Sequence, residues 1–362
     1  MSALPDLAVI SVTTVNYLHR ARALMQGVAR HLPEARRVVY CVDSPVDNRD
    51  VGTEDFALVD AATLALPRFR QLAFALNATG LCCALKPHAA LHALATGARR
   101  VIYLDNDIQL FRRPTEMLAA LERHHFILTP HLLGPLPPGA QPDATVVLAF
   151  GVFNAGMFAT TDDADSRAFL EWWGARTFDP ASMRPESGYD QIWLNFAPAF
   201  LAPAGILRDE GYNVAAWNLA SRPLTLTGEG FRVGPVPLTT FHFSWFDEAD
   251  PSRLVSPKAQ CNYRSGSPEA ALLKAYADTL VACGSAQYRN RPYGFSTFSD
   301  GRPISPEQRR IFAAEFWNAI PTDADPFDPT FTTPRFRGRD SLYRYHEFWV
   351  RAARALRRAL HH

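Results

Sequence analysis

The first third of the chain alternates short runs of β-branched residues with segments of helical periodicity. Residues 7–15, 36–43 and 99–107 have the composition of buried strands, and residues 18–32 and 84–98 have the apolar spacing of helices. Parallel strands need long crossover connections, which are usually helices that pack on the sheet. The alternation therefore predicts an α/β fold with a mainly parallel, Rossmann-like sheet flanked by helices.

The middle of the chain is less regular. A proline- and glycine-rich loop at 133–143 has the length of a lid, and residues 145–160 resemble two strands. Residues 166–177 indicate a helix, 189–200 a helix broken by proline, and 237–247 a strand that leads into a turn. This region is expected to complete the sheet and to supply loops at its edge.

The 362 residues exceed the usual size of a single core. After about residue 262 the strand patterns give way to helical segments at 267–283 and 305–320 and to a basic tail. We therefore predict two units, an α/β domain over residues 1–262 and a helical C-terminal extension over residues 263–362.

The overall composition favours a soluble globular protein. Hydrophobic residues make up 48% of the chain, charged residues 20%, and the formal net charge is only +1, so we expect no nucleic-acid partner. No signal peptide or membrane-spanning run is visible. The five cysteines form no CxxC pair, which favours a reducing, cytoplasmic location: Cys41, Cys82, Cys83, Cys261 and Cys283.

Two aspartates follow the strand predicted at 99–107. Asp105 and Asp107 flank Asn106, and residues two apart in an extended chain project toward the same side. Such a pair can hold one hard divalent cation such as Mg²⁺ or Mn²⁺ and leave coordination positions open for phosphate oxygens. An isolated pair of this kind is also common as the polar turn that ends a strand, and the motif alone does not decide between the two.

Segments around this pair resemble GT-A-type glycosyltransferases, most closely glycosyltransferase family 8. The stretch "LKPHAALHALATGARRVIYLDND" carries a lysine on a helix before the strand and the aspartate pair. "FNAGMFAT" (153–160), "YDQIWLN" (189–195) and "FHFS" (241–244) follow in the order of that family. The resemblance covers roughly residues 7–250 and depends on order and spacing more than on any single motif.

The resemblance implies a metal site and a donor-sugar site. Asp105, Asp107 and His242 would hold Mn²⁺, with Mg²⁺ as the alternative. The implied sugar-binding residues are Lys86, Asn154, Asp190 and Gln191, of which Asp190 and Gln191 would also be catalytic. Their amide and carboxylate groups suit sugar hydroxyls, which both donate and accept hydrogen bonds. Each also has a structural alternative; Asp190, for example, could cap a helix.

The same resemblance implies a nucleotide site at the carboxyl ends of the first strands. Thr13, Asn16 and Tyr17 would lie near the base or ribose, with Asp43, Asp105 and Asn106 beside them. A polar pocket with a tyrosine can stack on and hydrogen-bond a uracil, but these residues could equally cap the helix that follows. Uridine is therefore an implication of the family.

The implied activity is transfer of a hexose from a nucleotide-diphosphate sugar, expected to be a UDP-sugar, to a saccharide or glycolipid acceptor, with retention at the anomeric carbon. A non-catalytic sugar-nucleotide-binding protein is the alternative. A DxD phosphatase is disfavoured because its motif normally lies near the amino terminus. A sugar nucleotidyltransferase is disfavoured because no glycine-rich loop occurs early in the chain.

The chain departs from the family after His242. The closest members have a Gly-x-x-Lys segment there whose lysine meets the diphosphate, whereas here no lysine occurs before Lys258. Arg253, Lys258 or the "RFRGR" segment at 335–339 could take over this role.

The tail is strongly basic, with eight arginines from Arg335 onward. Together with Phe348 and Trp349 they suit an interfacial helix on anionic lipid, which would place the protein peripherally at the cytoplasmic face of a membrane. A helix that packs its aromatic face on the core is an equal alternative.

Overall fold

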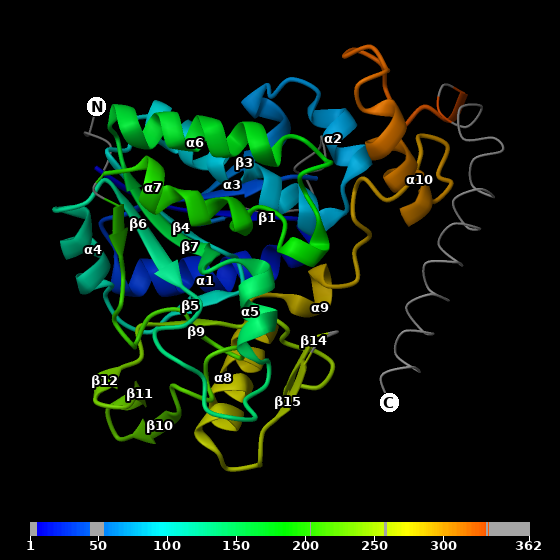
Figure 1. Cartoon of the computed structure of the whole chain (residues 1–362). Helices are drawn as coiled ribbons and strands as arrows, with labels where there is room; N and C mark the ends of the chain where they lie inside the picture. Colours follow the sequence, from blue (N-terminus) through cyan, green and yellow to red (C-terminus); the bar gives the residue numbers. More distant parts are fainter. Residues whose placement is uncertain (1–5, 44–53, 203, 257–258, 331, 333–362) are drawn as a thin grey trace.

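The computed structural model describes residues 6–43, 54–202, 204–256, 259–330 and 332. At its centre is a seven-stranded sheet in the order β3-β2-β1-β4-β7-β6-β8 (Figure 1). All neighbouring strands are parallel except the pairs that include β7. The predicted α/β fold with a mainly parallel sheet is therefore confirmed. The bounds of the strands are β1 Leu7–Thr13, β2 Arg36–Cys41, β3 Ala57–Asp60, β4 Arg100–Leu104, β6 Phe126–Pro130, β7 Phe153–Thr161 and β8 Ala204–Ile206.

Helices cover both faces of this sheet. Val9 of β1 packs in the cluster formed with α1 (Leu18–His31) and α4 (Thr115–Leu121). Its neighbour Ile10 points to the opposite face and packs with α3 (Ala78–Ala95) and α6 (Ala164–Thr177). Because successive side chains of a strand alternate between faces, a strand buried on both sides is a continuous apolar run, as in "LAVISV".

Two segments differ from the sequence prediction. Residues 145–160 do not form two strands, because the first half is helix α5 (Ala144–Phe150), whose backbone amides at Thr145 and Val146 are capped by the Asp143 carboxylate. Residues 191–196 form a 3₁₀ helix that runs into α7 (Ala197–Phe200). Pro198 lies in the first turn of α7, where its missing N–H costs no hydrogen bond, so the proline does not break the helix.

A small sheet lies beyond the carboxyl end of β4. It has the order β5-β13-β9, with bounds Ile108–Leu110, Thr240–His242 and Val214–Ala215. Helix α8 (Pro268–Ala282) packs against it, and the ring of Tyr276 stacks on that of Phe243 at a centroid distance of 3.7 Å. The other strands form a meander of β10 (Leu224–Thr227), β11 (Gly230–Val233) and β12 (Val236–Pro237), and a hairpin of β14 (Arg253–Ser256) and β15 (Ala259–Asn262).

The segment after residue 262 is helical where the structure describes it. It contains α8, α9 (Ser285–Tyr288) and α10 (Pro306–Ile311), which continues as a π-helical turn over Phe312–Phe316. Arg309 of α10 donates from Nη1 to the carbonyl oxygens of Ala73, Phe74 and Leu76, at the end of α2 (Phe69–Ala75). The C-terminal part is thus attached to the α/β layers by buried contacts, and the boundary at residue 262 stays a prediction.

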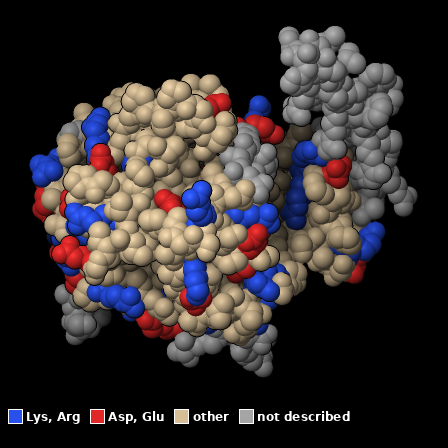
Figure 2. All heavy atoms as spheres, turned by 90° about the horizontal axis from the view of Figure 1, so that it is seen from below, with Lys and Arg blue, Asp and Glu red and all other residues tan. Residues whose placement is uncertain are grey.

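Charges are dispersed over the face seen from below in Figure 2, where basic and acidic residues intermingle among larger areas of other residues. Among the helices that the structure describes, none is long and apolar enough to cross a membrane. The basic tail and its "RFRGR" segment lie outside the described residues.

Candidate functional site

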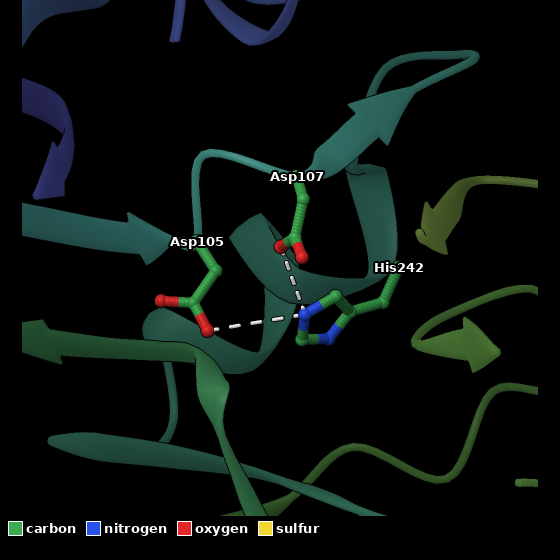
Figure 3. A group of neighbouring side chains, drawn as sticks. All are labelled: Asp105, Asp107 and His242. Carbon is green, nitrogen blue, oxygen red and sulfur yellow. Dashed lines mark ion pairs between the residues drawn. The ribbon is translucent and has the colours of Figure 1, made fainter. Parts of the chain in front are cut away.

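Asp105, Asp107 and His242 converge where the central sheet meets the small sheet (Figure 3). Asp105 directly follows β4, and its backbone N–H donates to the carbonyl of Gly156 on β7 at 2.8 Å. A tight turn, closed by a hydrogen bond from the Ile108 N–H to the Asp105 carbonyl, places Asp107 directly before β5. His242 pairs with Ile108 in the antiparallel ladder of β5 and β13. The sheet register therefore brings residues of distant segments together.

The three side chains form a donor set that fits a divalent cation. Nε2 of His242 lies 3.0 Å from Oδ1 of Asp107 and 3.9 Å from Oδ2 of Asp105. One ligand atom from each residue lies within 4.8 Å of the others. Two carboxylates with one imidazole suit Mn²⁺ or another first-row cation that accepts both oxygen and nitrogen. Burial would raise the pKa of Asp107, but charge on His242 and Arg20 holds it below the usual value.

Lys86 connects this cluster to Asp190. Its Nζ lies 3.1 Å from Oδ1 of Asp105 and 3.5 Å from Oδ2 of Asp190, deep in the protein. Burial opposes the charge of Lys86, but the two carboxylates raise its pKa above the ordinary value. Burial raises the pKa of Asp190 to about 6, although Lys86 acts in the opposite direction. The Asp190 carboxylate caps no helix, contrary to the structural alternative for this residue.

Carboxylate groups outnumber lysine and arginine side chains around the aspartate pair. Four carboxylates face two cationic side chains there: Asp105, Asp107, Asp190 and Glu248 against Lys86 and Arg20. Placing uncompensated charge in a buried site is costly, so clusters of this kind are usually paired or bind metal.

Asn154 and Gln191 line a cavity together with Asp105 and His242. Nδ2 of Asn154 donates to Nε2 of His131 at 3.1 Å and lies 3.4 Å from Oε1 of Gln191. His131 in turn contacts the carbonyl of Gly151 through Nδ1 at 2.9 Å, which requires the tautomer with a proton on Nδ1. Burial lowers the pKa of His131 to about 4, so the ring is neutral near pH 7. It thereby orients the amide of Asn154.

Two cavities meet at Lys86 and Asp105. The larger, of about 680 Å³, contains Asn154, Asp190 and Gln191, and also the side chains of Trp217 and Trp245. The smaller, of about 390 Å³, lies between the start of α1 and the aspartate pair. Both are within the size range of small-molecule sites. The predicted metal and sugar residues therefore share one composite site.

Only some of the residues predicted to bind the nucleotide line the smaller cavity. Tyr17, which is 39% exposed, and Asn106 line the smaller cavity, and Asn106 donates to the carbonyl of Val12 and to Oγ1 of Thr13. Thr13 is fully buried, and Asn16 accepts a hydrogen bond from Thr14.

Asp43 bonds two backbone segments that lie far apart in the sequence. Its two carboxylate oxygens accept from the backbone N–H groups of Val15, at 2.8 Å, and Gly294, at 2.9 Å. It lines neither cavity. Asp43 thus connects the loop before α1 to the C-terminal part of the chain.

Sequence reasoning missed several residues of the site. Gly156 passes so close that an added Cβ would lie 2.5 Å from Cε1 of His242 and 2.7 Å from Oδ2 of Asp105. Arg20 lines the smaller cavity beside Asp107 and pairs with Glu248. Arg20 could have been predicted, because it lies three residues after Tyr17 and therefore on the same face of the helix that begins there. His131, one residue beyond β6, was detectable as a polar group at a strand end.

Comparison with known proteins gives a structural likeness but no sequence match. No protein-family model matches the sequence, and no curated protein matches it. A crystal structure of mouse xyloside xylosyltransferase 1 in its apo form is similar over 65% of this chain and 97% of that chain, with 12% sequence identity and a TM-score of 0.40.

Proposed function

We propose that the protein is a GT-A-type glycosyltransferase that moves a hexose from a nucleotide-diphosphate sugar to a saccharide or glycolipid acceptor. The observation that carries the proposal is the convergence of Asp105, Asp107 and His242 at the junction of two cavities. A polar turn that merely ends a strand needs neither a histidine from a distant strand nor an adjoining cavity.

The two cavities provide separate places for the parts of such a donor. In the proposal, the base and ribose, expected to be those of a UDP-sugar, lie near Tyr17 and Asn106 in the smaller cavity. The sugar lies in the larger cavity, near Asn154 and Gln191. The diphosphate then spans the junction at Asp105, and the acceptor enters through the rest of the larger cavity.

The chemistry proposed is transfer with retention. Mn²⁺ bound by Asp105, Asp107 and His242 would neutralise charge that develops on the leaving diphosphate. Lys86 holds Asp105 and Asp190 in place through its two ion pairs. Asp190 and Gln191 line the cavity beside the expected sugar position and would stabilise positive charge on the sugar ring as the bond to the donor breaks.

A thermal-shift panel tests the proposal. Nucleotide-diphosphate sugars with Mn²⁺ are expected to raise the melting temperature of the wild type and to lose this effect in Asp107→Ala. Asp162→Ala, at a surface pair with Arg167, is the matched control. Stabilisation that persists unchanged in Asp107→Ala would contradict the metal assignment. Turnover of a stabilising UDP-sugar then distinguishes an enzyme from a non-catalytic binding protein.

The location is proposed to be cytoplasmic, with peripheral membrane contact through the basic tail. The arginine-rich composition from Arg335 onward supports this. Such a position would suit a glycolipid acceptor.

A further inference from the structure

Arg20 occupies the wall of the smaller cavity next to the aspartate pair. It lies in the first turn of α1, is only 9% exposed, and lines the cavity together with Asp105, Asn106 and Asp107. Burial opposes its charge, but the negative groups around it, which include Asp107 and Glu248, raise its pKa above the ordinary value. Arg20 therefore keeps a positive charge beside the proposed metal ligands.

The guanidinium group is held in one orientation. Its Nε and Nη2 donate to Oε1 of Glu248 at 2.9 and 2.8 Å, and Nη2 also reaches the carbonyl of Phe246 at 3.5 Å. Nε2 of His19 contacts the same carboxylate at 3.0 Å. No described residue is hydrogen-bonded to Nη1 of Arg20. Glu248 thus fixes the edge of the guanidinium group that carries Nε and Nη2, and the N–H groups of Nη1 remain able to donate hydrogen bonds.

Among the residues that the structure describes, no other cation is available at this position; Lys258 and the "RFRGR" segment lie outside them. Of the described residues that line the two cavities, Lys86 and Arg20 are the only lysine and arginine. Lys86 is already shared between Asp105 and Asp190. Arg253, a candidate from the sequence, pairs with Asp247 and Asp250 and lines neither cavity.

We propose that Arg20 binds the diphosphate of the sugar nucleotide, in the role for which the sequence offers no lysine directly after His242. The inference rests on the proposed function, because it presupposes a diphosphate donor. A planar guanidinium that is preorganised by Glu248 can present N–H groups to phosphate oxygens at little entropic cost. Its positive charge would add to that of the divalent cation beside the two phosphates.

Titration calorimetry on the full chain tests this assignment. The probes are UDP, uridine and inorganic pyrophosphate, each with excess Mn²⁺, and the variants are Arg20→Gln and the control Arg253→Gln. Arg20→Gln is expected to weaken UDP and pyrophosphate roughly ten- to hundredfold, as expected for loss of a charge-assisted hydrogen bond. Uridine affinity should change by less than about threefold, and Arg253→Gln should resemble the wild type.

Several results would overturn the assignment. Unchanged affinity of Arg20→Gln for UDP and pyrophosphate would place the diphosphate elsewhere, and an equal loss for uridine would indicate a packing role. If the wild type binds pyrophosphate but not UDP, the uridine donor is refuted, and the pyrophosphate affinities of wild type and Arg20→Gln alone decide the assignment of Arg20. Wild type that binds none of the three would overturn both proposals.

Arg20→Lys secures the test if Arg20→Gln does not fold, because it keeps the charge and most of the volume. A loss of pyrophosphate affinity of at least about threefold is expected, since an ammonium group cannot reproduce the planar arrangement of N–H groups that Glu248 holds in one orientation. Full wild-type affinity in this variant would contradict the proposal.

Discussion

At Gly156 the backbone of β7 passes directly beside the proposed metal ligands, so an added methyl group has no room. Gly156→Ala places a Cβ 2.5 Å from Cε1 of His242, and His242 must move. We expect Mn²⁺ affinity to fall at least about tenfold, with a loss of stability of roughly 1–3 kcal/mol from overpacking. Titration calorimetry and urea unfolding measure the two effects.

Gly134→Ala is the matched control for this substitution, because a Cβ at Gly134 meets nothing within 4 Å. Unchanged Mn²⁺ affinity in Gly156→Ala would mean that the metal does not depend on the position of His242.

Glu248 gives a prediction for the pH dependence of stability. Burial would raise its pKa, but hydrogen bonds from His19 and Arg20 lower it to about 2, from an ordinary value of 4.5. A carboxylate whose pKa is lowered by folding stabilises the protein above the unfolded-state pKa, and this contribution disappears as the pH falls through the folded-state pKa. The difference in free energy of unfolding between wild type and Glu248→Gln should therefore be largest above about pH 5 and should shrink toward pH 2.

Urea unfolding across this pH range measures that difference. Glu122→Gln, at an exposed pair with Arg100, controls for loss of a carboxylate. A wild-type advantage that is the same at pH 3 and pH 7 would argue against the ion pair of Arg20 and Glu248.

At the scale of elements, α5 forms part of the wall of the larger cavity through Val146, Val147 and Phe150. Its start is capped by the Asp143 carboxylate, which accepts from the amide of Thr145 at 2.7 Å and from that of Val146 at 3.2 Å. Asp143→Ala is expected to fray this short helix and to raise the KM for the acceptor several-fold, with little change in UDP affinity. Steady-state kinetics with varied acceptor measures the effect.

Asp60→Ala provides the control for α5, because Asp60 caps a 3₁₀ helix at Ala62 and lines neither cavity. An equal rise of the acceptor KM in both variants would show that α5 has no particular role in acceptor binding.

The same elements show what the sequence could predict. β1, α1 and β2 were recognisable because the periodicity of their apolar residues is unbroken. Helix α5 was not, since "TVVLAF" has strand-like composition and its main helical signal is the Asp143 cap. Among the site residues, the Asp105 and Asp107 pair was visible as a local motif. The ion pair of Arg20 and Glu248 was not, because 228 residues separate its members and only the folded chain brings α1 next to the segment after β13.

At the scale of the whole molecule, the segment after residue 262 contributes directly to the core beneath the site. Helix α8 buries four large side chains in one cluster with Phe241 of β13: Leu272, Leu273, Tyr276 and Leu280. Burying each such side chain is worth about 1.5–3 kcal/mol, and a whole protein of this kind is stable by only about 5–15 kcal/mol. Removing α8 alone would therefore cancel most of the stability.

A truncation tests this dependence. Residues 1–262 alone are expected to lack cooperative thermal unfolding and Mn²⁺ binding, because β13 and His242 lose their support. Residues 1–332, which retain every described contact, are expected to unfold cooperatively. Circular dichroism and calorimetry on both fragments decide the matter. A cooperatively folded fragment 1–262 that still binds Mn²⁺ would instead establish the domain boundary that the sequence predicts, and α8 would then be a peripheral addition and not part of the scaffold that positions His242.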